Sequence, residues 1–181
     1  MTAKNKSPDE ERETLNVGRC NAGAVKKAAR RLSLMYDSML APTGLRSTQY
    51  GILRELSSQG AALQTVGELA EKLVMDRSTV GQNLRPLERD RLVALLTDPK
   101  DRRSRLIALT KQGIAKFEQA TQYWKIAQDR FEAAFGRQEA EELRLLLHGI
   151  AYNEKLKIKK RSSAFPVTRS MPGHKLAKTK S

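Results

Sequence analysis

The side chains of this chain best suited to chemistry are polar ones that recur along one predicted helix, residues 76–89. At about 100° per residue, its apolar positions Val80, Leu84 and Leu87 fall on one side. The rest of its surface offers hydroxyl, amide and guanidinium groups, from Arg77, Ser78, Thr79, Gln82, Asn83 and Arg85. Hydroxyl and amide groups can donate and accept at base edges in the major groove, and arginine binds guanine or phosphate. We therefore predict that this helix reads duplex DNA through these residues.

A basic loop follows shortly after this helix, with the sequence DPKDRR at residues 98–103. Lys100, Arg102 and Arg103 supply positive charge that can cross the DNA backbone or enter the minor groove. Asp98 and Asp101 are expected to be structural, with Asp101 pairing with a nearby arginine to shape the loop. Either the helix or the loop alone would also fit an ordinary solvated surface. Their adjacency favours a DNA interface.

The elements that must position these groups form a helix-turn-helix followed by a β-hairpin. Thr65 and Glu68 form a capping box that begins one helix, and Asp76 can cap the next. Pro86 removes one hydrogen bond inside that second helix. Branched residues predict strands at 92–96 and 105–109, and Thr110 can cap a long helix after them.

Further helices are expected on both sides of this unit. Apolar spacing predicts helices at residues 20–40, 47–58 and 138–153, with Ser47 as the N-cap of the second. The predicted fold is mainly α with a small β-hairpin wing, a winged helix-turn-helix between N- and C-terminal helices. Trp124, in the long helix after Thr110, has no obvious partner within the chain, so we expect another surface to cover it.

The net charge of +14 suggests a polyanionic partner such as nucleic acid. Much of this charge lies in residues 155–181, which hold nine Lys or Arg and no acidic residue. We expect residues 1–19 to be a flexible segment and residues 155–181 to be a disordered basic tail. The tail either adds salt-dependent phosphate binding or is a solubilising appendage. No apolar stretch suggests a membrane span or a secretory signal, so we expect a cytoplasmic, nucleoid-associated protein without membrane contact.

Enzyme chemistry finds little support in the sequence. His148 and His174 have no partner at catalytic spacing, and no phosphate-binding glycine loop or nucleophile motif is present. The single cysteine, Cys20, can form no disulfide within the chain, and no Cys/His cluster predicts a metal site. We expect neither catalysis nor a cofactor.

The order of elements and five local motifs resemble the MarR family of winged-helix transcription regulators. The resemblance runs from about residue 20 to residue 153. Its most specific segments are LRSTQY at 45–50, VGELA at 66–70, DRSTV at 76–80, LRPLER at 84–89 and DPKDRR at 98–103, closed by LTKQG at 109–113. The family usually has glycine where Arg91 stands, so Arg91 must either adopt a left-handed conformation or end the helix differently.

This resemblance implies a MarR-type domain at residues 20–154, with the winged helix at about 45–110. Residues 20–40 and 111–154 are then the dimerisation helices of a homodimer. Two reading helices would face successive major grooves of a pseudo-palindromic operator on double-stranded DNA. The implied action is repression that a small ligand relieves. The operator and the regulated genes are not given by the sequence.

Ligand sensing is expected between the dimerisation helices and the reading unit, where Tyr36, Tyr50, Tyr123 and Trp124 can line a pocket. The resemblance implies a small aromatic or acyl-thioester effector. An alternative is peroxide sensing through Cys20, whose thiolate a helix N-terminus would favour. Another is that these aromatic residues are simply core residues. A different alternative function is a basic architectural or nucleoid protein, in which the tail does the binding.

Overall fold

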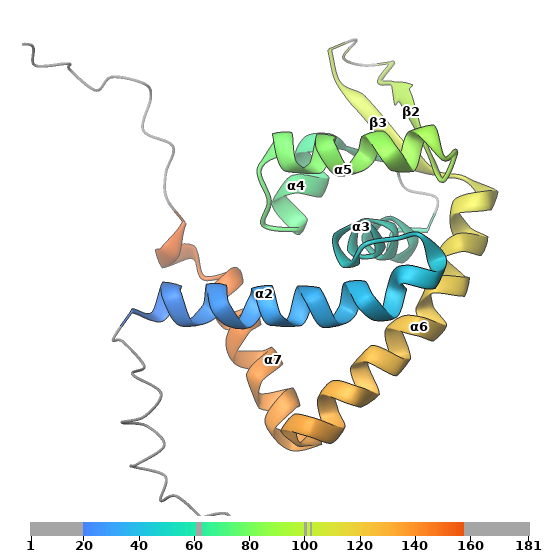
Figure 1. Ribbon diagram of the computed structural model, residues 1–181. Helices are drawn as coiled ribbons and strands as arrows, with labels where there is room; N and C mark the ends of the chain where they lie inside the picture. The colour runs from blue at the N-terminus through green and yellow to red at the C-terminus, as the bar shows by residue number, and fades with distance from the viewer. Residues whose placement is uncertain (1–19, 61–62, 100, 102, 158–181) are drawn as a thin grey trace, which may run out of the picture.

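The structure, a computed structural model, describes residues 20–60, 63–99, 101 and 103–157 (Figure 1). Two long helices, α2 (Asn21–Leu40) and α6 (Lys111–Phe135), and a third, α7 (Arg137–Ala151), lie on one side of the molecule. Between α2 and α6 in sequence come η1 (Ala41–Thr43), α3 (Ser47–Ser58), β1 (Gln64–Thr65), α4 (Val66–Lys72), α5 (Arg77–Arg89), β2 (Val93–Thr97) and β3 (Arg105–Leu109). The short η2 (Glu154–Leu156) follows α7.

The mainly α fold with a small β-wing is confirmed. The hairpin β2–β3 is antiparallel, with Val93 opposite Leu109 and Thr97 opposite Arg105. A third strand, β1, was not predicted from the sequence, and it pairs with β3 through Gln64 and Thr65. Two residues are too short to show an alternating pattern, so only the finished sheet, in the order β1-β3-β2, reveals this strand.

The main core fills the space between α3, α4, α5 and the sheet. Its largest side chains are fully buried, among them Ile52, Leu53, Leu69, Leu84 and Ile107. Leu40 from α2 and Ala120 from α6 belong to the same core. The unit that presents α5 and the wing therefore has a closed core, in which Gln64 of β1 is a buried polar side chain.

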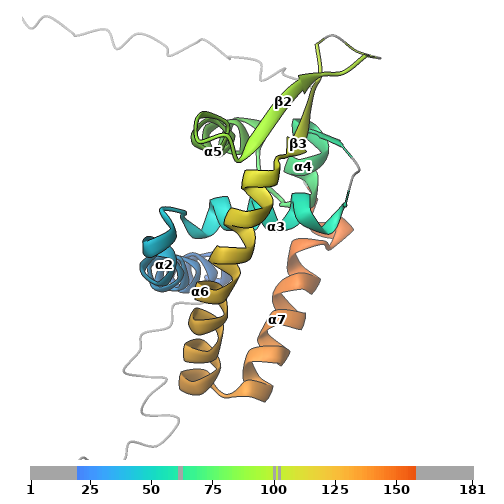
Figure 2. The ribbon, with the colours of Figure 1, turned by 90° about the vertical axis from the view of Figure 1, so that its right-hand side faces the viewer.

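The terminal helices pack differently. In Figure 1, α6 and α7 form a V whose arms α2 crosses, and Figure 2 shows α6 and α7 side by side with α2 seen nearly end-on. Many of their large apolar side chains remain exposed, including Leu34 at 62%, Leu145 at 68% and Leu146 at 67%. These helices leave much of their apolar surface without a cover inside the chain.

A chain of polar contacts joins the three terminal helices. The Tyr36 hydroxyl on α2 donates to Gln128 Oε1 on α6 at 2.7 Å. Gln128 Nε2 donates in turn to Glu132 Oε1 at 2.9 Å, and Arg144 on α7 donates to the same oxygen at 3.2 Å. Gln128 and Arg144 hold the pKa of Glu132 below its usual value, whereas burial raises the pKa of Tyr36. These contacts fix the relative positions of the three helices.

Four sequence-based expectations need correction. The N-cap of α3 is Arg46, not Ser47, since the Gln49 side chain accepts from the Arg46 N–H at 2.9 Å and Ser47 is already the first helical residue. The Ser47 N–H donates to Asp37 of α2 at 2.7 Å. The first wing strand lies one residue later than expected, and the last helix ends at Ala151. Trp124 does have an intrachain partner, because its ring stacks on Tyr50 with the centroids 6.0 Å apart.

Candidate nucleic-acid interface

The reading helix α5 begins with a strong N-terminal cap. Asp76 accepts from the Thr79 N–H at 2.8 Å and from the Thr79 hydroxyl at 2.7 Å, and the Ser78 hydroxyl also donates to it. These hydrogen bonds, that from Ser78 foremost, hold the pKa of the Asp76 carboxyl well below its usual range. The first turn of α5 is therefore fixed at the point where it can approach a DNA backbone.

The buried side of α5 holds its outer side in place. Val80, Leu84 and Leu87 are fully buried against the core. Ser78, Gln82 and Arg85 are exposed on the other side. The helix thus presents a hydroxyl, an amide and a guanidinium in one row on a rigid support, which is what base readout in a major groove requires.

Two other predicted contacts are partly engaged within the protein. Thr79 and Asn83 are half-buried, and Asn83 Nδ2 donates to the Thr79 carbonyl at 2.9 Å. Arg77 is exposed, but its guanidinium lies over Gly67 of α4, where a β-carbon would come within 3.0 Å of Nη2. Gly67 in the VGELA motif therefore makes room for Arg77, so the first turns of α4 and α5 lie against each other.

The wing loop is shaped from within by Asp101. Its carboxylate accepts from the Arg103 backbone N–H at 2.9 Å and from the Ser104 hydroxyl at 3.0 Å. These partners belong to the loop itself, and the expected pairing of Asp101 with an arginine stays a prediction because Arg102 lies outside the described residues. Arg103 is exposed, and the Asp98 N–H closes the loop by donating to the Ser104 carbonyl at 3.2 Å. Lys100 and Arg102 lie outside the described residues.

A contact that was not predicted from the sequence joins the wing to the end of the reading helix. The Thr110 hydroxyl donates to the Arg91 carbonyl at 2.7 Å and accepts from the Gly113 N–H at 2.9 Å. A β-carbon on Gly113 would lie 2.0 Å from the Leu92 carbonyl oxygen, so only glycine fits there. The LTKQG motif at residues 109–113 was the sequence signal from which this contact could have been predicted. It clamps the start of α6 onto the turn between α5 and β2.

Both helices of the reading unit end in the same way, without glycine. Val74 after α4 and Arg91 after α5 adopt left-handed conformations, with φ of 51° and 57°. The next amide in each case donates five residues back, Met75 to Ala70 and Leu92 to Leu87, both at 2.8 Å. Arg91 therefore adopts the left-handed turn, so the expected wing connection is kept.

Of the four aromatic residues expected at a ligand pocket, Tyr50 and Trp124 stack on each other, while Tyr36 and Tyr123 pack at other contacts of α2 and α6. Tyr50 is buried and stacks on both Phe117 and Trp124, with its centroid 5.4 Å from that of Phe117. Tyr123 is half-buried against the core, and Tyr36 lies at the α2–α6 contact. Trp124 has one face covered by Tyr50, and the Arg54 guanidinium lies 5.4 Å from its ring centroid.

An open hollow of about 450 Å³ lies elsewhere, between α2 and α6. Its lining is Arg31, Leu32, Leu34, Met35, Ser38, Arg130 and Phe131. None of the four aromatic residues named above contributes to it. Because it lies among the exposed apolar side chains of the terminal helices, it belongs to the surface that a second subunit could cover.

Other chemistry has little support in the described part of the chain. Cys20 is exposed at the start of α2, where its sulfur accepts from the Gly23 N–H at 3.3 Å. Within residues 20–60, 63–99, 101 and 103–157, no group of three or more His, Cys, Asp or Glu could hold a metal ion. No helix in the same ranges is both long and apolar enough to cross a bilayer.

Comparisons of sequence show similarity to transcription regulators. The sequence profile described as "MarR family" matches residues 43–104. The transcriptional activatory protein BadR of Rhodopseudomonas palustris is 35% identical over 95 residues, which are 51% of this chain and 50% of BadR. The chain thus matches only about half the length of this curated relative.

Comparisons of structure extend the similarity over most of the fold. The M. tuberculosis transcriptional regulator MosR, solved in complex with DNA, is 30% identical with a TM-score of 0.65, over 74% of this chain and 94% of MosR. The transcriptional repressor CouR, bound to a 23-mer DNA duplex, is 27% identical with a TM-score of 0.65, over 73% of this chain and 92% of CouR. CouR of Rhodococcus jostii has also been solved with p-coumaroyl-CoA. These similarities do not favour an architectural protein or a peroxide sensor.

Proposed function

The chain belongs to the MarR family of winged-helix transcriptional regulators, and we propose that it is a homodimeric repressor that binds double-stranded DNA sequence-specifically and responds to a ligand. In this proposal α5 reads base edges, while the wing contacts the neighbouring backbone or minor groove. Its place of action is the cytoplasm, on the chromosome. MarR-family proteins of this kind are DNA-binding regulators, and we propose no catalytic role.

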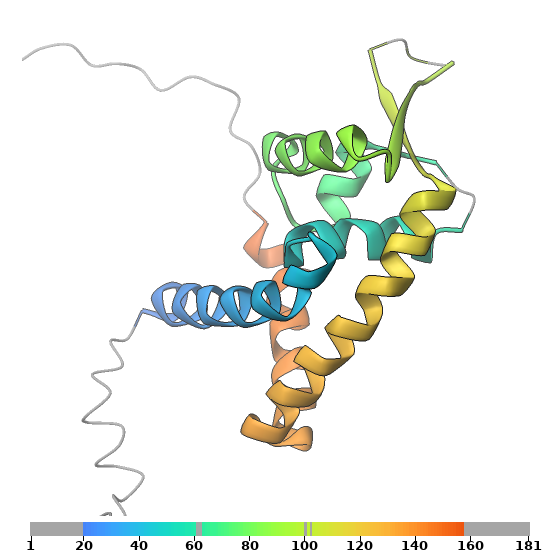
Figure 3. The same ribbon diagram turned by 45° about the vertical axis from the view of Figure 1, so that its right-hand side comes forward.

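The observation that carries this proposal is the row of exposed polar groups on α5, from Ser78 through Gln82 to Arg85, above a fully buried apolar side. A helix held in this way loses little conformational entropy when it enters a groove. The wing stands beside its C-terminal end, in Figure 3 as in Figure 1. Lys100, Arg102 and Arg103 are proposed to contact the DNA there, although the first two lie outside the described residues.

Dimerisation is proposed from the terminal helices. Leu34, Ile126, Leu145, Leu146 and Ile150 are all more than half exposed in the single chain. Large apolar surface of this kind is unusual on a monomer and typical of an interface. The charges on these helices also support dimerisation through them. Residues 26–31 of α2 include Lys26, Lys27, Arg30 and Arg31, and the first half of α7 carries Glu139, Glu141 and Glu142. A two-fold dimer would present two copies of α5 to a pseudo-palindromic operator.

For the effector we propose a small aromatic acid or its acyl thioester. The support is the relative CouR, a repressor solved with p-coumaroyl-CoA, and the aromatic group Tyr36, Tyr50, Tyr123 and Trp124 near the junction of the terminal helices with the winged helix. Trp124 is half-buried and is the single tryptophan, so its fluorescence reports on ligands that reach this junction. A titration with aromatic acids and their coenzyme A thioesters should change its emission. A constant emission with every compound would contradict this site.

The DNA-binding proposal is tested by selecting duplexes from a random library and measuring the affinity of variants for the selected operator. Arg85→Ala should weaken operator binding by about 1–3 kcal/mol, the usual contribution of a good base contact. Arg137→Ala removes the same charge at the exposed junction of α6 and α7, far from α5, and should bind normally. Equal losses in the two variants, or selection of no preferred sequence, would refute sequence-specific reading by α5.

A further inference from the structure

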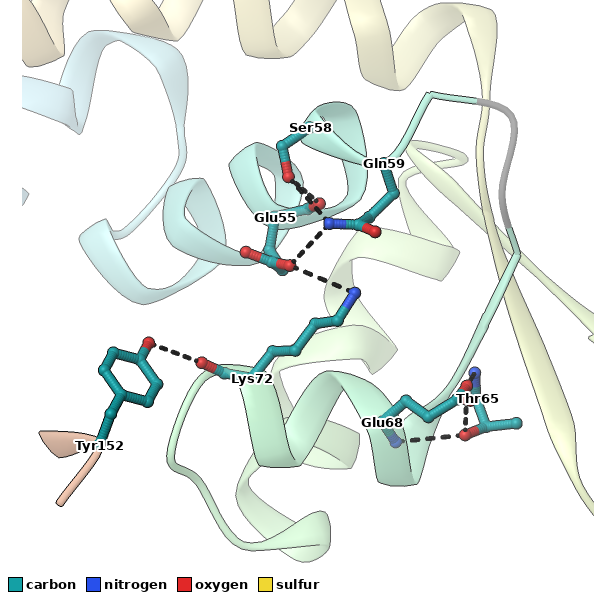
Figure 4. A network of polar contacts seen from close by, with 7 residues as sticks. All are labelled: Glu55, Ser58, Gln59, Thr65, Glu68, Lys72 and Tyr152. Carbon is teal, nitrogen blue, oxygen red and sulfur yellow. Dashed lines mark hydrogen bonds and ion pairs between the residues drawn. The ribbon is translucent and has the colours of Figure 1, made fainter. Parts of the chain in front are cut away.

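The last helix, α7, runs back along α6 and ends beside the winged-helix unit. The hydroxyl of Tyr152, the residue at which α7 ends, donates to the Lys72 backbone carbonyl of α4 at 3.0 Å, as Figure 4 shows. The His148 ring stacks on the Tyr152 ring with the centroids 5.8 Å apart, which orients the phenol. This contact, which we call the Tyr152 latch, joins two helices that are far apart in sequence.

The Lys72 carbonyl lies at the end of α4, where the last carbonyls of a helix have no amide of the same helix to bond with. The amides of residues 73–75 donate to other carbonyls of α4. The Tyr152 hydroxyl therefore caps α4 from outside the winged-helix unit. Only three residues separate Lys72 from Asp76, the N-cap of α5. A contact that holds this carbonyl thus also holds the start of the reading helix.

The helix that carries the latch is itself held to α6. Arg144 of α7 donates to Glu132 Oε1 of α6 at 3.2 Å, and Ala140 of α7 is fully buried. The turn between the two helices is at Gly136, whose φ of 99° is a conformation that favours glycine. Because α7 is fixed along α6 in this way, the latch connects α4 to a rigid arm and not to a loose chain end.

The winged-helix unit therefore meets the terminal helices on two sides. On one side, Leu40 of α2 and Ala120 of α6 are buried in its core. On the other side is the latch. In Figure 1, α6 and α7 are the arms of a V, and the winged-helix unit lies across the opening between the arms. With the first attachment alone the unit could rock on α6, and the second attachment restricts that motion.

Rocking of this kind would matter in a dimer. It would change the distance between the two α5 helices, and that distance decides which spacing of half-sites both helices can read at once. We propose that the Tyr152 latch holds each winged-helix unit at one angle to the terminal helices and so makes DNA binding selective for one spacing. This proposal rests on the proposed dimeric DNA-binding function and deepens it. Tyr152 is then a positioning residue, which acts on α5 through α4.

The first test measures the distance between the two reading helices. Glu88 is exposed on α5 and has no proposed DNA contact, and Cys20 is the single cysteine. Glu88→Cys in a Cys20→Ser background therefore places one spin label on each subunit. Pulsed electron paramagnetic resonance should give a narrow distance distribution for this protein. Tyr152→Phe, which keeps the ring on His148, should broaden it, because the loss of one hydrogen bond raises the open population by about two- to tenfold.

Lys72→Ala is the matched control. It removes the ion pair in which Lys72 Nζ lies 3.7 Å from Glu55 Oε1 of α3, and it keeps the backbone carbonyl that the latch uses (Figure 4). Since both side chains of this pair are partly exposed, its loss should have little effect. The distribution should therefore stay narrow. Equal widths in the parent, Tyr152→Phe and Lys72→Ala proteins would overturn the latch.

The second test moves the half-sites of the selected operator one base pair closer together or further apart. The parent protein should bind these duplexes about tenfold more weakly than the operator or worse. Tyr152→Phe should reduce this penalty about two- to fivefold, and it should bind a single half-site as the parent does. A penalty that Tyr152→Phe leaves unchanged would contradict the proposal.

Failure of the proposed function would look different from failure of the latch. If the labelled parent gives no distance between subunits, or if no operator is selected, the dimeric DNA-binding function fails. The latch is then judged in the single chain by hydrogen exchange. The amides of Val74 and Met75, which donate back to α4 at 3.1 and 2.8 Å, should exchange about two- to tenfold faster in Tyr152→Phe. Equal exchange rates would show that the latch does not hold this turn.

Discussion

Apolar side chains are arranged differently in the two halves of this molecule. In the winged-helix half, residues 45–110, the large apolar residues of the core are almost completely buried, and Leu53, Leu69 and Leu84 expose at most 1% of their surface. In the terminal half, formed by α2, α6 and α7, Leu145 and Leu146 expose about two thirds of theirs. Both halves are helical and amphipathic, so the contrast lies in what covers the apolar side.

This difference indicates how the two tasks of the protein are divided. The winged-helix half can hold the row of polar groups on α5 by itself, because its core is closed within one chain. The terminal half is closed where α2 and α7 pack against α6, as at the buried Ala127 and Ala140, and a second copy of the chain would cover the apolar surface that stays exposed. The distance between the two reading helices would then depend on the terminal half, and the contacts to bases would depend on the winged-helix half.

Breaking the closed core should have the largest effect. Leu84 is 1% exposed beneath the reading side of α5, so Leu84→Ala should lower the free energy of unfolding by about 2–5 kcal/mol. Chemical denaturation measures the change. Leu96→Ala on the wing, where the side chain is 44% exposed, is the matched control and should cost much less. Similar losses at both positions would mean that the winged-helix half lacks the closed core described above.

A charge introduced into the exposed apolar surface of the terminal half should separate the subunits without unfolding them. Leu146 on α7 is 67% exposed in the single chain, and Leu146→Glu should weaken self-association at least tenfold, because a carboxylate would be buried in an apolar interface. Sedimentation velocity measures the association, and circular dichroism should show unchanged helix content. Gln138→Glu adds the same charge at an exposed polar position of α7 and should leave the dimer intact. Dimers that survive Leu146→Glu would place the interface elsewhere.

The winged-helix half buries one polar side chain without a hydrogen-bond partner among the described residues, that of Gln64 in β1. This side chain is 4% exposed, and neither its nitrogen nor its oxygen has a hydrogen-bond partner among the described residues. Gln64→Leu should raise the free energy of unfolding by about 1 kcal/mol, since an unsatisfied buried amide costs about 1–3 kcal/mol. Thermal and urea unfolding measure it. Gln112→Leu, at an exposed position of α6, should give no gain. Destabilisation by Gln64→Leu would show that the amide makes a favourable contact, such as one through water.

The smallest effects are expected at the two left-handed turns that flank α5. Val74 is β-branched at φ 51°, a conformation that costs such residues about 1–2 kcal/mol. Val74→Gly should therefore stabilise the chain by about 0.5–1 kcal/mol, after allowance for the greater backbone entropy of glycine. Val74→Ala keeps the β-carbon and should gain less. The same comparison at Arg91, with glycine and alanine, should go in the same direction. Equal results for glycine and alanine would show that these turns are not strained.

Much of the fold followed from local sequence signals. The capping residues Thr65, Asp76 and Thr110 each cap the helix expected, because a cap is a bond between neighbours in sequence. The start of α5 followed from the Asp76 cap, and β3 followed from its run of branched residues. The cap of α3 was predicted wrongly, because Arg46 is the N-cap and Ser47 is the first helical residue, with its N–H donating to Asp37 of another helix.

The candidate site was less accessible to sequence reasoning than the fold. The apolar periodicity of α5 indicated which side chains face outward, and Ser78, Gln82 and Arg85 are exposed as that pattern predicts. Nothing local indicated that Arg77 lies over Gly67, or that Asn83 is held by its own helix. The pattern of four aromatic residues likewise could not distinguish a ligand pocket from the stack that Tyr50 forms with Phe117 and Trp124.

The sequence by itself determined the order of helices and strands, the polar row of α5 and the basic charge of the tail, because periodicity, capping and charge are properties of neighbouring residues. Only the tertiary structure decided what lies against what. It placed β1 beside β3, clamped Thr110 onto the end of α5 and brought Tyr152 to Lys72. Such contacts join residues many positions apart, and they form because burial and hydrogen bonding act through space rather than along the chain.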